Sequence, residues 1–322
     1  MITTRRRRTI GVAATAVALT LGACGSDEPA ENADDGIAVV ASTDVWGSVV
    51  SAVGGDLVSV TSIIDDPAAD PHSYESTATD GLEVADAELV VYNGGGYDDF
   101  AGKLAEQAGD VPVIEAFALS GYAEDAHAEE AHAEDEAHGH DEDAHDHGAN
   151  EHVWYDLPTV AKVADEVAEQ LAEIQPEHAE TFTGNAAAFQ AELGELTKRL
   201  AEIGAEQPDA AVLATEPVAH YLLDGAGLTD STPDSFSRAI EGETDVPVAA
   251  QDEVNQLIEG KRVVAVINNP QTETPVTEQV LIQAQNSGVP VVDMTETLPE
   301  GETDYLTWIS GQVDALAAAV GR

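Results

Sequence analysis

Residues 150–156 read Asn-Glu-His-Val-Trp-Tyr-Asp and stand between a run of histidines and acids and a long helical pattern. A second stretch, Asp-Pro-His-Ser-Tyr-Glu at residues 70–75, carries a matching histidine upstream. His72 and His152 are each expected beyond the end of a strand, and imidazole is a common metal ligand. The two stretches therefore predict two imidazoles brought to one metal site on an α/β scaffold.

Short apolar runs rich in β-branched residues alternate with helical patterns along the chain. This alternation indicates mainly parallel sheets covered by helices on both faces. It occurs twice, which predicts two similar α/β lobes, and a last helix is expected at residues 306–320. Strands are predicted at residues 37–43, 58–64, 88–93, 111–114, 210–215, 262–268 and 289–292.

A single apolar stripe marks one long helix at residues 177–203. At ~1.5 Å per residue this helix would span roughly 40 Å, longer than one small lobe needs. We expect a rigid helix that joins the two lobes; a coiled-coil dimer is the alternative, but a single stripe of fewer than four heptads argues against it. The protein is accordingly expected to be a monomer. The stripe consists of Phe182, Ala186, Phe189, Leu193, Leu196, Leu200 and Ile203.

These patterns divide the chain into three folded parts. Residues 37–176 form the predicted N-terminal lobe, residues 177–205 the connecting helix and residues 206–322 the C-terminal lobe. Together they amount to enough chain for two lobes that each bury a core.

The first residues are typical of an export signal. Residues 1–23 carry four consecutive arginines and then an apolar run too short for a permanent membrane span. The run ends in Leu-Gly-Ala-Cys, which resembles a bacterial lipoprotein signal; a twin-arginine signal fits less well. Cys24 would then be the lipidated N-terminus, followed by an acidic tether over residues 24–36. We therefore expect an extracytoplasmic protein anchored to the membrane by lipid.

The charge balance limits the classes of partner. The chain has 62 acidic and 12 basic residues, and its one cysteine excludes disulfides and thiolate zinc sites. Without residues 1–23, 8 basic residues face 62 acidic ones, a formal charge of −54. Such a chain repels nucleic acid and anionic lipid and attracts cations. Adaptation of the surface to a salty habitat is an equally good explanation of the acid excess.

Residues 123–149 consist only of Ala, Glu, Asp, His and Gly. With no apolar face to bury, this segment is expected to be a solvated loop. Imidazoles interleaved with acids would capture zinc loosely near the site, although a charged surface loop with no role in delivery is the alternative. The six histidines are His127, His132, His138, His140, His145 and His147.

Glu216 follows the strand predicted at residues 210–215. Ligands of open α/β sheets bind beyond the carboxyl ends of the strands, so Glu216 and His72 both suit a site between lobes. After residue 36 the chain resembles the substrate-binding lipoproteins of bacterial zinc and manganese ABC importers. The resemblance rests on residues 70–75 and 151–156, the histidine-rich segment before the latter, and the long helix.

The resemblance implies a ligand set. His72 and His152 match the family's two histidine ligands, and Glu216 stands where zinc members typically have histidine and manganese members glutamate. The fourth ligand would be a carboxylate near the last strand, either Glu296 or Asp293. His220 would then be a neighbour of the site. Ser76 and Ala78 replace prolines that the family often has after the first ligand, which puts the rigidity of that loop in question.

The resemblance also implies the function. Two imidazoles and two carboxylates suit four-coordinate zinc, or manganese when the carboxylates bind through both oxygens. The histidine-rich segment favours zinc. We expect a protein that binds zinc outside the membrane and delivers it to an ABC permease and its ATPase subunit; a manganese-specific member, or an adhesin or scaffold with a structural metal, is the alternative. No His-Glu-x-x-His motif is present, which argues against a metallohydrolase.

Overall fold

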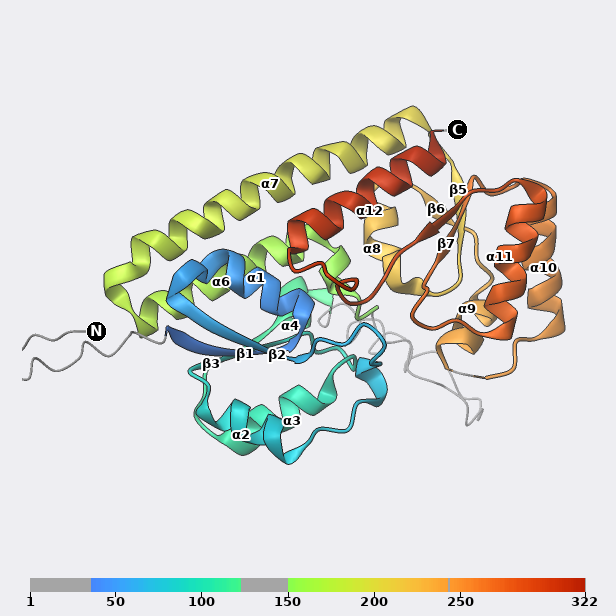
Figure 1. Cartoon of the computed structure of the whole chain (residues 1–322). Coiled ribbons are helices and arrows are strands. Elements are labelled where there is room, and N and C mark those ends of the chain that lie inside the picture. The colour runs from blue at the N-terminus through green and yellow to red at the C-terminus, as the bar shows by residue number, and fades with distance from the viewer. Residues whose placement is uncertain (1–35, 123–149, 243, 322) are drawn as a thin grey trace, which may run out of the picture. The chain divides into compact units, whose positions relative to one another are not determined.

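The computed structural model describes residues 36–122, 150–242 and 244–321 (Figure 1). The predicted leader, the tether up to residue 35 with Cys24, and the histidine-rich segment at residues 123–149 lie outside the described residues. Within the described ranges, no helix has both the length and the apolar character needed to cross a membrane.

The first lobe is built on a four-stranded parallel sheet of strand order β2-β1-β3-β4. Residues alternate between its two faces. Val39 and Ala41 of β1 belong to a core shared with helices α1 and α6, whereas Val40 packs in a separate core under α2 and α3 (Figure 1). The strands are β1 (Ile37–Thr43), β2 (Val58–Ile64), β3 (Leu89–Tyr92) and β4 (Val113–Glu115). The helices are α1 (Asp44–Gly54), α2 (Ala78–Asp86), α3 (Asp99–Ala108), α4 (Ala116–Ser120) and α6 (Leu157–Ile174).

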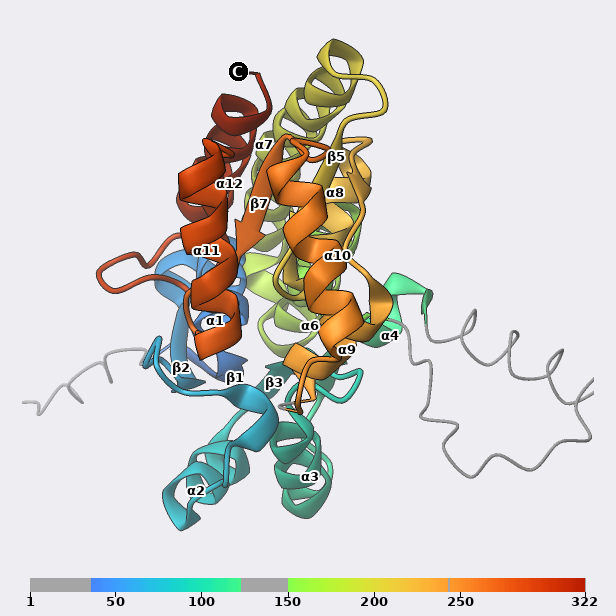
Figure 2. The ribbon, with the colours of Figure 1, turned by 90° about the vertical axis from the view of Figure 1, so that its right-hand side faces the viewer.

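The second lobe repeats this plan with strand order β6-β5-β7-β8, again all parallel. Leu213 of β5 and Val266 of β7 pack in a core with helices α9, α10 and α11. Figure 2 shows α10 and α11 side by side on this face of the sheet. The strands are β5 (Ala211–Ala214), β6 (Thr229–Asp230), β7 (Ala265–Asn268) and β8 (Val291–Asp293). The helices are α8 (His220–Gly225), α9 (Asp234–Glu241), α10 (Val248–Glu259), α11 (Pro275–Ser287) and α12 (Tyr305–Val320).

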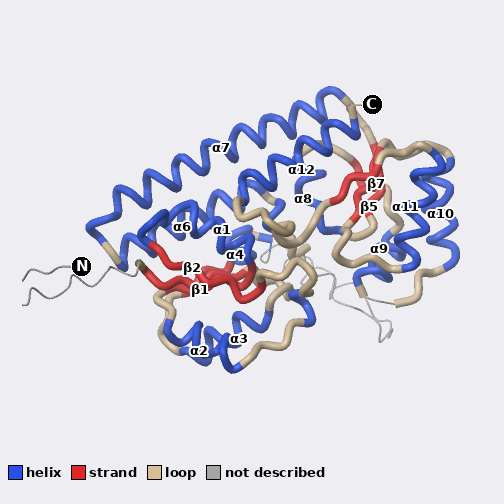
Figure 3. The backbone as a smooth tube through the Cα atoms, viewed as in Figure 1, coloured by secondary structure: helices blue, strands red, loops and turns tan. Residues whose placement is uncertain are grey.

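Helix α7 (Ala179–Glu206) is the long helix that the apolar stripe predicted, and all seven stripe residues are buried. Its 28 residues correspond to about 42 Å at 1.5 Å per residue. It begins after a short 3₁₀ turn at Pro176–His178, slightly later than predicted. Figure 3 shows α7 running past both groups of strands. It packs against α1 and α6 of the first lobe and against α8 and α12.

The two lobes share one hydrophobic core along α7, and the described residues from Gly36 onward form one compact unit. Helix α12 strengthens this connection although it closes the second lobe. The backbone N–H of Tyr305 donates to Ser48 Oγ at 2.8 Å, and the Tyr305 hydroxyl donates to the carbonyl oxygen of Trp154 at 2.7 Å. Both partners belong to the first lobe. The fold therefore has two sheets but a continuous interior.

Candidate metal site

His72 lies in a short 3₁₀ turn, Pro71–Ser73, in the connection that follows β2. The Asp-Pro-His-Ser sequence explains the turn, because proline suits its first position and aspartate caps its N-terminus. Asp70 Oδ1 accepts the backbone N–H of His72 at 2.9 Å, and Asp70 Oδ2 accepts the Ser73 hydroxyl at 2.7 Å. The His72 ring stands edge-on to Tyr97, with the ring centroids 5.0 Å apart.

His152 is 3 % exposed and immediately precedes another 3₁₀ turn, Val153–Tyr155. Asn150 Oδ1 accepts the backbone N–H of His152 and lies 2.9 Å from its Nδ1. The Asn150 amide nitrogen donates instead to the carbonyl oxygen of Pro217, which fixes Oδ1 toward the ring. Nδ1 therefore carries the proton and leaves the Nε2 lone pair for a metal. Burial, with His72 and His220 nearby, lowers the pKa of His152 to about 3, so the ring is neutral.

Trp154 and Tyr155, which follow His152, pack against Tyr97 and bond to the second lobe. The Trp154 ring lies 5.1 Å from the His152 ring and 4.4 Å from Tyr97, centroid to centroid. The Tyr155 hydroxyl donates to the carbonyl oxygen of Thr295 at 2.8 Å. Thr295 precedes Glu296, so the motif at residues 150–156 reaches the loop of the second lobe that carries the predicted fourth ligand.

Glu216 and Glu296 follow β5 and β8, and both are buried, at 8 % and 7 % exposure. Asn269, the residue after β7, donates its side-chain amide to both: to Glu216 Oε2 at 2.8 Å and to Glu296 Oε1 at 2.7 Å. The Thr272 hydroxyl also donates to Glu216 Oε2. Burial raises the pKa of Glu216. Burial, aided by the charge of Glu216, raises the pKa of Glu296 to about 8.

Asp293, the alternative fourth ligand, makes a different contact. It is the last residue of β8, it is exposed, and its Oδ1 accepts the side-chain amide of Asn268 at 2.9 Å. Asn268 and Asn269 are neighbours in sequence but have different partners. The Asn268 amide donates to Asp293, whereas the Asn269 amide donates to both Glu216 and Glu296. The structure thus brings Glu296, and not Asp293, together with Glu216.

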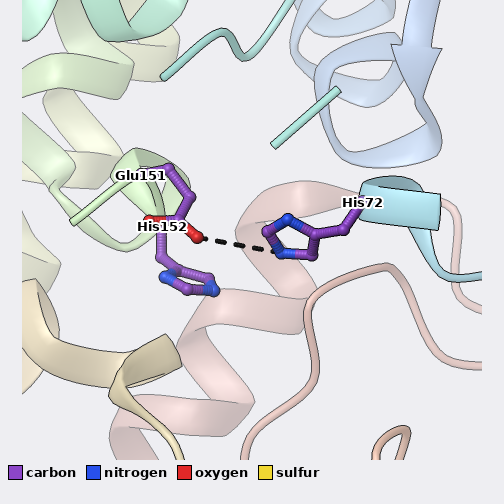
Figure 4. Close-up of side chains that lie close together, drawn as sticks. All are labelled: His72, Glu151 and His152. Atoms are coloured by element: carbon purple, nitrogen blue, oxygen red, sulfur yellow. Dashed lines mark ion pairs between the residues drawn. The ribbon is translucent and has the colours of Figure 1, made fainter. Parts of the chain in front are cut away.

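The first lobe contributes a cluster in which Glu151 joins the two histidines (Figure 4). His72, Glu151 and His152 each offer a ligand atom, and these atoms lie within 4.8 Å of one another. The carboxylates of the second lobe act on residues that surround this cluster. Burial, with the charge of Glu296, raises the pKa of Tyr97, whose ring stands edge-on to His72. Burial is also the main cause of the raised pKa of Glu296, to which Asp70 adds a smaller part.

Sequence reasoning missed three residues of this region. Glu151 stands inside the decisive motif, directly before His152, and could have been considered. Asn269 follows a buried strand at the polar pair of residues 268 and 269, a signal for a strand end at a site. Tyr97 had no sequence signal. His220 is exposed and packs edge-on against Tyr221, with ring centroids 5.1 Å apart, so it borders the site without joining the cluster.

Comparison with known proteins identifies the family. A model for zinc-uptake complex component A, periplasmic (ZnuA), matches residues 39–319. The chain belongs to the ZnuA family. It is 26 % identical over 247 residues to the manganese-binding lipoprotein MntA of Halalkalibacterium halodurans, covering 72 % of this chain and 76 % of that one. It is 27 % identical over 197 residues to the manganese ABC transporter substrate-binding lipoprotein PsaA of Streptococcus pneumoniae, covering 59 % of each chain.

Solved structures share the ZnuA-family fold. The periplasmic zinc-binding protein TroA of Treponema pallidum matches with a TM-score of 0.66 at 18 % identity, over 88 % of this chain and 99 % of that one. By sequence, the chain is also 23 % identical to the iron-binding protein YfeA of Yersinia pestis, over 94 % of this chain and 92 % of that one. The prediction of two parallel-sheet lobes joined by a long helix is confirmed. The protein is a metal-binding component of an ABC importer and not an enzyme; relatives named for manganese, iron and zinc leave the metal open.

Proposed function

We propose that this protein binds one divalent cation outside the membrane, between its lobes, and delivers it to the permease and ATPase subunits of an ABC importer. His72, His152, Glu216 and Glu296 are the proposed ligands. The supporting observation is that one amide, that of Asn269, joins two buried carboxylates. One of them, Glu296, acts on Tyr97, whose ring packs against both imidazoles. Among the described residues, no lysine or arginine forms an ion pair with either carboxylate. Buried carboxylates without a cation are costly, so a metal ion would complete the site.

Zinc is the cation that we propose. Two imidazoles and two carboxylates satisfy the four-coordinate geometry of zinc, and zinc outranks manganese in intrinsic affinity for such donors. The histidine-rich segment at residues 123–149 would add loose capture of zinc close to the site. In the sequence, this segment ends directly before Asn150, the residue whose Oδ1 orients the His152 ring.

Manganese is the second candidate. The observation in its favour is the third carboxylate, Glu151, beside the two histidines. Oxygen-rich donor sets suit manganese better than zinc. MntA and PsaA carry manganese in their names, and both are similar to this chain.

The location and assembly of the protein are also part of this proposal. Cys24 would carry a lipid that holds the protein at the outer face of the membrane as a monomer.

A metal-dependent adhesin or scaffold would differ from an importer component in one respect. Its metal would be structural, so stripping the metal would unfold it, whereas an importer component folds without metal because it must bind and release its cargo.

The test uses the soluble chain from residue 25 onward and a version lacking residues 123–149. Both are stripped of metal, shown to remain folded, and reloaded with zinc and manganese in competition. We expect one tightly bound ion per chain in both versions, with zinc preferred, and loss of that ion in His152→Ala. Preference for manganese in the shortened version would replace zinc by the second candidate. Loss of all tight binding on deletion of residues 123–149 would disprove the four-ligand site.

A further inference from the structure

We propose that Glu151 is a further metal ligand, and that its carboxylate raises the affinity of the site for manganese relative to zinc. This inference rests on the proposed function. His72, Glu151 and His152 would then form a three-ligand half-site within the first lobe, here called the N-lobe half-site. Glu216 and Glu296 would complete the coordination from the second lobe.

The spacing in the N-lobe half-site is that of ligands and not of hydrogen-bonded partners. His72 Nε2 lies 3.7 Å from Glu151 Oε1 (Figure 4), which is too long for a hydrogen bond. Two donors that each bind an ion at about 2.1 Å lie about 3.0–3.5 Å apart when the angle at the metal is 90–110°. A small contraction of the cluster would therefore bring its donor atoms to bonding distance of one ion.

The position of Glu151 is fixed by the loop that follows β3. Its carbonyl oxygen accepts the side-chain amide of Asn93 at 2.8 Å, and the Asn93 backbone N–H is held by Asp98 Oδ2 at 2.7 Å. Gly95, with φ +68°, allows a close approach, because a Cβ there would lie 3.2 Å from Glu151 Cβ and 2.9 Å from the Phe117 ring. The carboxylate is thus carried into the cluster on a braced backbone.

Within the part of the chain that the structure describes, no lysine or arginine forms an ion pair with the carboxylate of Glu151. Its side chain is 16 % exposed, and its only ion-pair partner among the described residues is His72. The two groups of that pair are 3.7 Å apart, which is too long for a hydrogen bond, so His72 does not satisfy the carboxylate. A divalent cation bound between the two would neutralise the carboxylate.

A third carboxylate changes which cation fits. Four donors fill the tetrahedral shell of zinc, so a fifth protein ligand adds little to zinc binding. Manganese takes more ligands and prefers oxygen donors, so the Glu151 carboxylate contributes more to its binding. Removing Glu151 should therefore lower the affinity for manganese more than that for zinc.

The experiment compares the wild-type chain from residue 25 onward with Glu151→Gln, using the metal ions alone as probes. Zinc and manganese dissociation constants are measured by competition with chelators, and cobalt(II) spectra report the coordination number. Glu241→Gln is the matched control, because Glu241 acts electrostatically on both Glu151 and Glu216 from α9 without belonging to the cluster. Glu151→Asp retains the charge on a shorter stem, and His152→Ala tests the site itself.

We expect Glu151→Gln to weaken manganese binding about tenfold or more, which corresponds to about 1.4 kcal/mol, with a smaller loss for zinc. The cobalt spectrum should change from the weak bands of five- or six-coordination to the intense bands of a tetrahedral site. Equal losses for both metals, of the size seen in Glu241→Gln, or an unchanged cobalt spectrum would overturn the inference. If His152→Ala retained wild-type affinity, the proposed function itself would fail, which is a distinct result.

Discussion

The side-chain amide of Gln271 in the second lobe donates to the carbonyl oxygen of Pro67 in the first, at 2.6 Å. The same nitrogen donates to Thr297 Oγ1 at 2.6 Å, and Gln271 Oε1 accepts the backbone N–H of Glu296, also at 2.6 Å. Pro67 lies in the connection that leads from β2 to His72. One side chain therefore holds the Glu296 loop and the His72 loop in register.

Replacing Gln271 by alanine should loosen that register. We expect metal to dissociate faster and to bind about tenfold more weakly, as found when groups that orient ligands are removed. Release into a fluorescent chelator, followed by stopped flow, measures the rate. Gln251→Ala is the control, since the Gln251 amide donates to Gln279 Oε1 at the surface of the second lobe, at 3.4 Å. A dissociation rate equal to that of the control would show that the lobes keep their register without Gln271.

Asn269→Leu should weaken metal binding by about 10- to 100-fold, because the two carboxylates that it orients lose their common donor. The matched variant is Asn268→Leu, which removes the amide that serves Asp293 and leaves the Glu216–Glu296 pair intact. Isothermal titration of both variants with zinc measures the difference. A larger loss in Asn268→Leu would point to Asp293 as the fourth ligand instead of Glu296.

Asn150→Ala should lower metal affinity by about 10- to 100-fold, since the His152 ring loses the acceptor that fixes its proton on Nδ1. The change should appear in the affinity, with only a modest loss of thermal stability. Asn185→Ala is the control. It also removes one partly buried hydrogen bond, which Asn185 Nδ2 donates to the Val53 carbonyl oxygen, and neither residue is near the cluster in sequence. Equal affinity in the two variants would argue against an orienting role for Asn150.

The metal-free protein should lose stability as the pH rises. Glu296 has a pKa of about 8 in the fold against 4.5 ordinarily, so between these values the folded chain holds a proton that the unfolded chain has released. This stabilising contribution is fully present below pH 4.5 and is lost as the pH rises through 8. Glu216 contributes in the same direction.

Thermal melts of the metal-free chain from pH 5 upward measure this effect, at about 2 °C in Tm for each kcal/mol in a protein of this size. Glu296→Gln should flatten the dependence and raise the Tm at pH 8, because no carboxylate has to ionise there. A saturating metal ion should also remove the decline, since it binds the ionised form. A Tm profile that Glu296→Gln leaves unchanged would contradict this account.

Much of the fold follows from local pattern. The bounds of β1 and β2 agree with the runs at residues 37–43 and 58–64, and the buried face of α7 is the predicted stripe. The sequence did not reveal β6, because its two residues are exposed and too few to show a pattern. Residues 123–149 and Cys24 stay predictions, since they lie outside the described residues.

The site was harder to predict because its contacts join distant parts of the chain. Spacing placed both Glu296 and Asp293 near the end of the last strand, and only the three-dimensional path after β8 separates them. Asn269 could not be assigned a partner from sequence, since its two acceptors lie 53 and 27 residues away. The identities of the proposed ligands remain predictions for the metal-binding experiments.

The continuous core along α7 has a consequence for how the protein unfolds. Phe182 at one end of the helix and Ile203 at the other belong to the same set of packed side chains, which also includes residues of both sheets. Exposing the core of one lobe would expose part of the other, so neither lobe can melt by itself at low cost. Calorimetry should therefore record a single endotherm, and the calorimetric enthalpy should equal the van't Hoff enthalpy.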